Sequence, residues 1–282
     1  MQRRRDSYQI DVNVQQTSKN NPAGNNQQAR PGMLQRILTL CLAELLGTSF
    51  LMFFGCMSLV SGFSQAPVSD MQPALVFGFV VSTIIVVFGH ISGAHLNPSV
   101  TVAALVLRDI SVLEAVVYVL AQCAGCILGY ALLGVATPHE IFSYGVPAGS
   151  GQCVTMPHPS LSHPQALLVE FLGTALLVFT CCGVWDHRNA HQGDSNPVKF
   201  ALVITLLSIT VGPYTGASLN PARSLAPAVV NNVWTNLWIY WVAPPLAGLV
   251  TPLIYKYAFE RKRLEKQPDD TPSTISPVMT KH

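Results

Sequence analysis

Two asparagines, each followed directly by proline, are the residues of this sequence best suited to bind a small polar molecule. They lie in the segments Gly-Ala-His-Leu-Asn97-Pro and Gly-Ala-Ser-Leu-Asn220-Pro, 123 residues apart. Proline suits the first turn of a helix, so each asparagine is predicted to stand at a helix N-terminus. A side-chain amide there can donate hydrogen bonds to a passing oxygen atom, or it can simply cap its own helix.

Each of these two Asn-Pro segments, termed boxes, follows an apolar run that could reach the middle of a bilayer. The two tripeptides are Asn97, Pro98, Ser99 and Asn220, Pro221, Ala222. A helix N-terminus carries unpaired N–H groups and about half a positive charge. Two such ends facing each other in mid-membrane would oppose cations and protons. One box alone would favour a plain helix cap, whereas two copies at membrane depth favour a pore.

Two acidic residues recur in the same way. Glu44 and Glu170 each lie in a segment of the form x-Glu-x-Leu-Gly-Thr, 126 residues apart. An acid within an apolar span is a candidate functional residue, for example a proton relay in a coupled transporter. It can also accept hydrogen bonds from the irregular backbone that enters the membrane in its own half. One acid per repeat favours this scaffolding role.

Arg223 is the basic residue closest to a box. It follows Asn220 by three residues, which places both on one helical face. An arginine at this depth is predicted to be a selectivity donor at an outer constriction, where its charge excludes cations and its N–H groups bind a solute oxygen.

The composition predicts an all-α membrane protein. Half of the 282 residues are hydrophobic and 11% are charged, against about 25% charged in soluble domains. A helix needs about 20 apolar residues to cross a bilayer. We predict half-helices at 98–107 and from Asn220 to about 229. The six full spans are predicted at about 34–61, 73–92, 112–136, 164–184, 198–212 (short) and 233–258.

Three full spans per half force the second half to insert upside down, which is the inverted-repeat architecture. The predicted channel domain is 34–258, with repeats at 34–136 and 164–258, between disordered tails at 1–33 and 259–282. Fifteen of the sixteen Lys and Arg residues then fall on the cytosolic side. Basic residues favour that side, so an integral membrane protein of the plasma membrane with both termini cytosolic is predicted.

The paired boxes, the paired glutamates and the six spans resemble the aquaporin, or major intrinsic protein, family over about residues 34 to 258. Ser99 stands where the family usually has alanine. The resemblance implies a homotetramer with one pore per subunit. It also implies that Glu44 and Glu170 support the pore rather than carry protons.

The resemblance further places an outer constriction at Phe77, Ser208, Ala217 and Arg223. Water-selective members usually carry histidine where this chain has Ser208. Glycerol channels of the main group usually carry glycine there, an aromatic residue at Ala217 and aspartate at Ser224. A water-channel frame with a small residue in place of the histidine resembles the insect entomoglyceroporins, which implies passage of glycerol and urea as well as water. A water-selective aquaporin is the alternative.

Two histidines flank the inner side of the first box. His90 and His95 could line the cytosolic half of the pore and tune it with pH, or they could serve only in packing.

The seven cysteines predict no disulfide framework, because six fall in apolar spans and Cys153 is alone in a loop. The Cys123-x-x-Cys126 pair is interpreted as packing, since no second ligand pair accompanies it. Neither a nucleophile–base set nor a metal cluster is apparent, so no catalysis, metal or cofactor is expected.

We therefore predict a passive channel whose partners are water, glycerol, urea and the lipid bilayer, with no nucleic acid. An alternative of another class is a coupled secondary transporter, which saturating or pH-driven flux would indicate. A junction protein with a vestigial pore is a further alternative, although the complete polar set argues against it.

Overall fold

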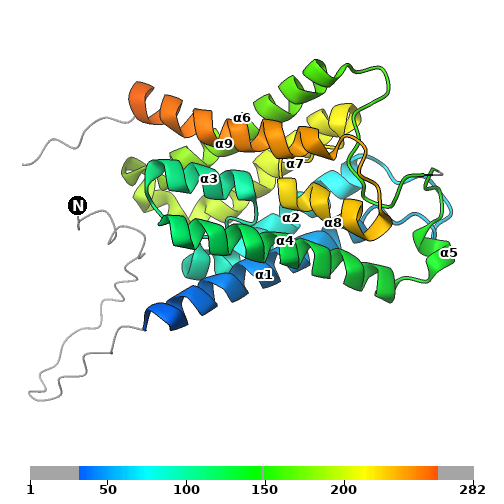
Figure 1. Cartoon of the computed structure of the whole chain (residues 1–282), viewed down its shortest axis with the longest axis horizontal. Coiled ribbons are helices and arrows are strands. Elements are labelled where there is room, and N and C mark those ends of the chain that lie inside the picture. The colour runs from blue at the N-terminus through cyan, green and yellow to red at the C-terminus, as the bar shows by residue number, and fades with distance from the viewer. Residues whose placement is uncertain (1–31, 148, 260–282) are drawn as a thin grey trace, which may run out of the picture.

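The computed structural model describes residues 32–147 and 149–259, and all regular elements in these ranges are helices. The helices are α1 (Met33–Met57), α2 (Met71–Ser92), α3 (Pro98–Leu107), α4 (Val112–Ala136), α5 (His139–Phe142), α6 (His163–Trp185), the 3-10 helix η1 (His187–Ser195), α7 (Asn196–Thr215), α8 (Pro221–Asn231) and α9 (Leu237–Ala258) (Figure 1). The two predicted tails lie outside the described residues, apart from their innermost positions. The predicted all-α fold with six spans and two half-helices is confirmed.

Six of the helical segments described are long and apolar enough to cross a membrane. They carry large exposed apolar side chains, among them Leu42, Phe79, Leu120, Leu172 and Leu202. A soluble protein rarely exposes apolar surface on this scale. These side chains are therefore placed to contact lipid.

The first and second halves of the chain interlock through their half-helices. The long helices pair as α1 with α4, α2 with α7 and α6 with α9. The half-helix α3 packs on α9, whereas α8 packs on α4, so each half-helix lies against the last long helix of the other half. In Figure 1, α3 and α8 approach the middle of the molecule from opposite ends.

Close helix contact depends on glycine at two positions. A Cβ atom on Gly129 of α4 would lie 2.0 Å from the carbonyl oxygen of Ser49, and one on Gly248 of α9 would lie 2.3 Å from that of Ser99. Small residues let membrane helices approach this closely. Gly248 therefore determines how tightly α3 sits against α9.

Several helix ends differ from the predicted ones. The span predicted at 198–212 is longer, because α7 continues through Pro213 to Thr215 and ends at Gly216, which has a φ of 80°. The last span begins at Leu237 rather than 233, since Asn232 and Asn236 both adopt left-handed backbone and place a turn before it. The short helices α5 and η1 were not predicted.

The prediction that no disulfide forms was wrong. Cys56, in the last turn of α1, is bonded to Cys153 in the segment between α5 and α6. Sequence position assigned Cys56 to an apolar span, and nothing local showed that a loop 97 residues later folds back onto the end of this helix. Cys123 and Cys126 are free thiols. Among the described residues no group of metal-ligating side chains occurs.

Candidate pore

The two box asparagines bind each other's half of the protein. The Oδ1 atom of Asn97 accepts from the backbone N–H of Ser99 at 2.8 Å, and that of Asn220 accepts from Ala222 at 3.0 Å. Each asparagine therefore caps its own half-helix, with proline in the first turn as predicted.

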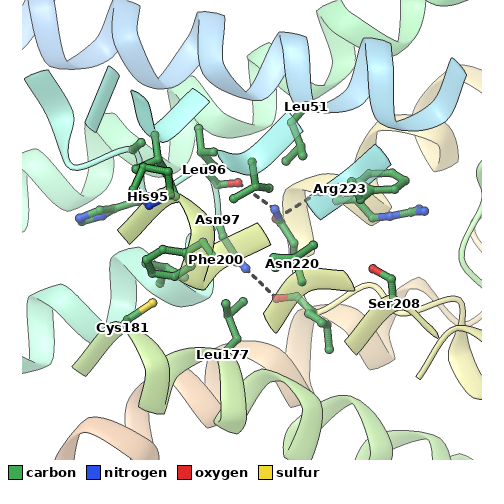
Figure 2. Close-up of a pocket in the computed structure, with 18 of the residues that line it drawn as sticks. Leu51, His95, Leu96, Asn97, Leu177, Cys181, Phe200, Ser208, Asn220 and Arg223 are labelled. Carbon is green, nitrogen blue, oxygen red and sulfur yellow. Dashed lines mark hydrogen bonds between the residues drawn. The ribbon is translucent and has the colours of Figure 1, made fainter. Parts of the chain in front are cut away.

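The amide nitrogens of the same side chains reach across. Asn97 Nδ2 donates to the carbonyl of Leu219 at 2.7 Å, and Asn220 Nδ2 donates to that of Leu96 at 2.8 Å. Figure 2 shows this pair of reciprocal hydrogen bonds. An amide has two N–H donors, and these bonds use one of them. The second remains available to a solute, so capping and solute binding are compatible.

The arms that precede the boxes have irregular backbone. Ala94, Leu96, Ala217 and Leu219 all have positive φ, between 45° and 57°. Alternating left-handed residues cannot form the regular hydrogen bonds of a helix. In a membrane their N–H groups therefore need partners from elsewhere in the protein.

Glu44 supplies those partners in the first half. Its carboxylate, fully buried, accepts from the backbone N–H groups of His95 at 3.0 Å and Leu96 at 2.8 Å. It also accepts from Ser92 Oγ at 2.6 Å and Gln122 Nε2 at 2.8 Å. The carboxylate is thus surrounded by donors on both oxygens.

Glu170 repeats the arrangement in the second half. It too is fully buried, and it accepts from Thr215 Oγ1 at 2.6 Å and from the N–H groups of Ser218 at 3.0 Å and Leu219 at 2.8 Å. Neither glutamate lines the cavity described next. This geometry supports a scaffolding role over a proton relay.

A continuous cavity of about 1540 Å³ passes between the half-helices. Its wall includes Asp70 and Pro73 at the start of α2 and reaches Asp109 and Asp194 near the other end of the molecule. Both box asparagines line it, whereas Pro98, Ser99, Pro221 and Ala222 are buried beside it. The apolar wall residues include Leu51, Val100, Leu177 and Phe200.

The four predicted constriction residues all line this cavity: Phe77, Ser208, Ala217 and Arg223. Figure 2 shows Ser208 and Arg223 on one side of the asparagine pair and His95 on the other. The cavity therefore has a basic, small-residue end and a histidine end.

Arg223 is held from two directions. Its Nη1 donates to the carbonyl of Cys153 at 2.6 Å, and its guanidinium carbon lies 5.4 Å from the centre of the Phe77 ring. Cys153 and its neighbours Gln152 and Val154 line the cavity as well. Sequence reasoning missed these three residues, because an irregular loop carries no periodic signal that it folds into a pore.

The two histidines near the first box differ in burial. His95 is buried, its Nδ1 lies 3.3 Å from Thr101 Oγ1, and its ring packs 4.8 Å from that of Tyr118. His90 is exposed, and both histidines line the cavity. His95 therefore both packs and faces the cavity.

Six membrane-crossing helices, two half-helices joined through paired asparagines and a cavity running between them define a membrane channel. The chain belongs to the major intrinsic protein family, whose sequence model matches residues 34–255. Members of this family are passive channels and not enzymes.

Relatives of this chain include aquaporin-4 from Mus musculus, 37% identical over 220 residues, which cover 77% of this chain and 66% of the relative. Aquaporin-4 from Homo sapiens is 38% identical over 193 residues, or 68% and 58% of the two chains. The chain thus spans about three fifths to two thirds of the length of these relatives. The lens fiber major intrinsic protein of Lithobates pipiens is 37% identical over 222 residues, covering 78% of this chain and 81% of the relative.

Among solved structures, the aquaglyceroporin from Plasmodium falciparum superimposes with a TM-score of 0.70 at 26% identity, covering 79% of this chain and 96% of that chain. The chain is thus similar to aquaporins and to an aquaglyceroporin alike. The similarity to the entomoglyceroporin subgroup stays a prediction.

Proposed function

We propose that this protein is a passive channel for water, glycerol and urea in the plasma membrane. The observation that carries the proposal is the small residue Ser208 at the Arg223 end of the cavity, where water-selective members usually carry histidine. Ala217, also small, lines the cavity as well. Together they leave room beside Phe77 for a three-carbon polyol.

The chemistry of this end suits a polyol. Arg223 offers N–H donors, and the hydroxyl of Ser208 has no hydrogen-bond partner within the described part of the chain. The Phe77 ring offers an apolar surface to the carbon edge of the solute. Glycerol leaves hydrogen bonds to water behind, and each one left unreplaced in a buried site costs about 1–3 kcal/mol. The polar groups are therefore as necessary as the width.

Protons and cations are excluded by two groups in this proposal. The N-termini of α3 and α8 bring their partial positive charges to the middle of the cavity, and Arg223 adds a full charge toward one end. The coupled-transporter alternative is disfavoured, because Glu44 and Glu170 are occupied by scaffold hydrogen bonds and lie outside the cavity wall.

The assembly and topology are part of the proposal. The first residues of α1 and the last residues of α9 lie at one end of the molecule, with α5 at the other (Figure 1). This arrangement supports two cytosolic termini, given the basic residues there. We also propose a homotetramer with one pore per subunit, as family membership suggests.

Substituting Ser208 with histidine tests the proposal. An imidazole would close one side of the constriction, and each 1.4 kcal/mol of added barrier slows flux about tenfold. We expect Ser208→His to lower glycerol and urea permeability at least about tenfold, while water permeability changes far less. Stopped-flow swelling of proteoliposomes with equal amounts of each protein measures all three solutes. Wild-type protein that excludes glycerol, or a histidine variant that passes it equally well, would favour the water-selective alternative.

A further inference from the structure

The outer wall of the cavity near Arg223 is a loop and not a helix. Gln152, Cys153 and Val154, from the segment between α5 and α6, line the cavity there. An isolated loop would fluctuate, and a fluctuating wall cannot define a selective opening. The contacts that hold this loop therefore bear on the selectivity of the channel.

Hydrogen bonds hold the loop on either side of Cys153. The hydroxyl of Tyr130, on α4, donates to the carbonyl of Gln152 at 2.6 Å. The hydroxyls of Thr155 and Ser224 lie 2.6 Å apart and share a hydrogen bond between the loop and α8. These contacts keep the loop near the pore, but neither acts on the carbonyl that Arg223 binds.

Cys153 itself is held by the covalent bond to Cys56 of α1, with the two Cα atoms 5.5 Å apart. Cys56 is fully buried and Cys153 is 8% exposed. The backbone of Cys153 is left-handed, with φ at 64°. Residues other than glycine rarely adopt this conformation, and it persists where the surroundings enforce it. In this conformation the Cys153 carbonyl accepts from Arg223 Nη1 at 2.6 Å.

We propose that the Cys56–Cys153 disulfide is a positioning element of the selectivity filter. By holding the Cys153 backbone, the disulfide keeps the Cys153 carbonyl oxygen hydrogen-bonded to Arg223. The guanidinium is thereby fixed against Phe77, at the edge of the opening. The inference rests on the proposed function, which assigns Arg223 to the filter.

The direction of the effect follows from the burial of Arg223. Without the disulfide, Cys153 can leave its left-handed conformation and its carbonyl turns away. A buried guanidinium N–H that loses its acceptor must find another, because an unsatisfied charged donor is costly. The water-filled cavity offers the nearest one. The arginine side chain then moves into the opening, which hinders a three-carbon polyol more than it hinders water.

The experiment compares Cys56→Ala, Cys153→Ala and the double variant with wild type in proteoliposomes. We expect glycerol permeability to fall at least about threefold and water permeability to fall less than about twofold. Cys126→Ala is the matched control, because Cys126 is a free, fully buried cysteine in the same apolar cluster. We expect it to leave the glycerol-to-water ratio unchanged. A merely structural role would lower both fluxes in proportion to the loss of folded protein.

The bond can also be broken after folding, which covers the case of poorly folding variants. A trialkylphosphine in detergent reduces the disulfide to two thiols and becomes the phosphine oxide, taking its oxygen from water. A thiol count on the unfolded protein confirms two additional thiols before reconstitution. Reduced protein or folded variants with the wild-type glycerol-to-water ratio would overturn the inference.

Arg223→Val, measured alongside, separates this inference from the proposed function. A variant that keeps the wild-type glycerol-to-water ratio shows that Arg223 is not a filter residue, and the positioning inference then fails together with the filter role of Arg223, whereas the passage of glycerol is decided by wild type and Ser208→His. If Arg223→Val changes the ratio but loss of the disulfide does not, the positioning inference alone fails.

Discussion

The two halves of this channel hold their membrane-entering arms with nearly the same set of hydrogen bonds. In each half a buried glutamate accepts from one hydroxyl and two backbone N–H groups of its own arm, at closely matching distances. In each half a tyrosine hydroxyl also donates to the carbonyl of the residue before the arm's glycine. Tyr118 donates to Ser92 and Tyr240 to Thr215, both at 2.7 Å.

The halves differ where the cavity is lined. Three residues after the box asparagine, the first half has Val100 and the second has Arg223. Both line the cavity. Both halves keep the parts that hold irregular backbone in a membrane, because any such arm needs them. The residue facing the solute was free to differ, and this makes the two ends of the pore unequal.

The halves also differ behind the scaffold. Gln122 of α4 donates to Glu44 at 2.8 Å and to Thr101 Oγ1 at 3.0 Å. Four residues after the matching tyrosine, α9 has Pro244, which has no side-chain donor. The first glutamate therefore accepts one more hydrogen bond than the second.

Making the second box resemble the first should have the largest effect. Arg223→Val gives the second half the residue type that the first half has at Val100. A unit charge about 4 Å from a passing cation costs about 4 kcal/mol at an effective dielectric constant of 20. We therefore expect proton or cation flux to rise at least about tenfold, with water flux within about twofold. A pH-sensitive dye inside proteoliposomes reports the proton flux. Wild type that already conducts protons at the variant's rate would contradict the barrier account.

Replacing one carboxylate oxygen with NH2 in each half tests the equivalence of the two scaffolds. In Glu44→Gln the new NH2 can turn toward the Ser92 hydroxyl, which can accept, so that only the His95 N–H is left without an acceptor. In Glu170→Gln it leaves only the Leu219 N–H without an acceptor. An orphaned buried donor costs about 1–3 kcal/mol. We expect each variant to destabilise the protein by about 1–3 kcal/mol.

Thermal unfolding in detergent, followed by a buried-thiol dye, measures this pair. Clearly unequal destabilisation by the two glutamine variants would contradict the equivalence of the two scaffolds.

The smallest change in stability or flux is expected from a substitution away from the pore, where α6 meets η1. The Asp186 carboxylate accepts from the backbone N–H and guanidinium of Arg188 and from the Tyr255 hydroxyl at 2.9 Å. Arg188 holds the pKa of Asp186 well below its usual range. A depressed carboxyl pKa contributes stability that is complete above the unfolded value of about 3.9 and is lost as pH falls through the lower folded value.

Asp186 should therefore stay charged throughout pH 5.5 to 8. We expect Asp186→Asn to lower the midpoint of thermal unfolding by a few degrees, by the same amount across this range, with the glycerol-to-water ratio unchanged. Unfolding scans and swelling assays at both ends of the range measure this. If the wild-type protein loses stability between pH 7 and 5.5 and Asp186→Asn does not, Asp186 is being protonated in this range and the prediction is contradicted.

Local sequence is enough to predict the helices and the polar residues at their ends. The half-helix at Pro98–Leu107 and the span at Val112–Ala136 appear at the predicted residues, because proline after asparagine and unbroken apolar runs act on neighbouring residues. The recurrence of Glu44 and Glu170 likewise indicated scaffolding before any contact was known. Both signals are local or repeated, so they can be read without the fold.

Which distant groups meet could be seen only once the chain was folded. Asn97 donates to Leu219, Cys56 is bonded to Cys153, and the carbonyl of Cys153 accepts from Arg223. In each pair the residues are 70 to 122 positions apart. Their approach depends on how whole helices pack and on where an irregular loop closes, and neither leaves a period or a spacing in the sequence. For this reason the loop residues that line the opening could not be predicted from the sequence, whereas Arg223 could.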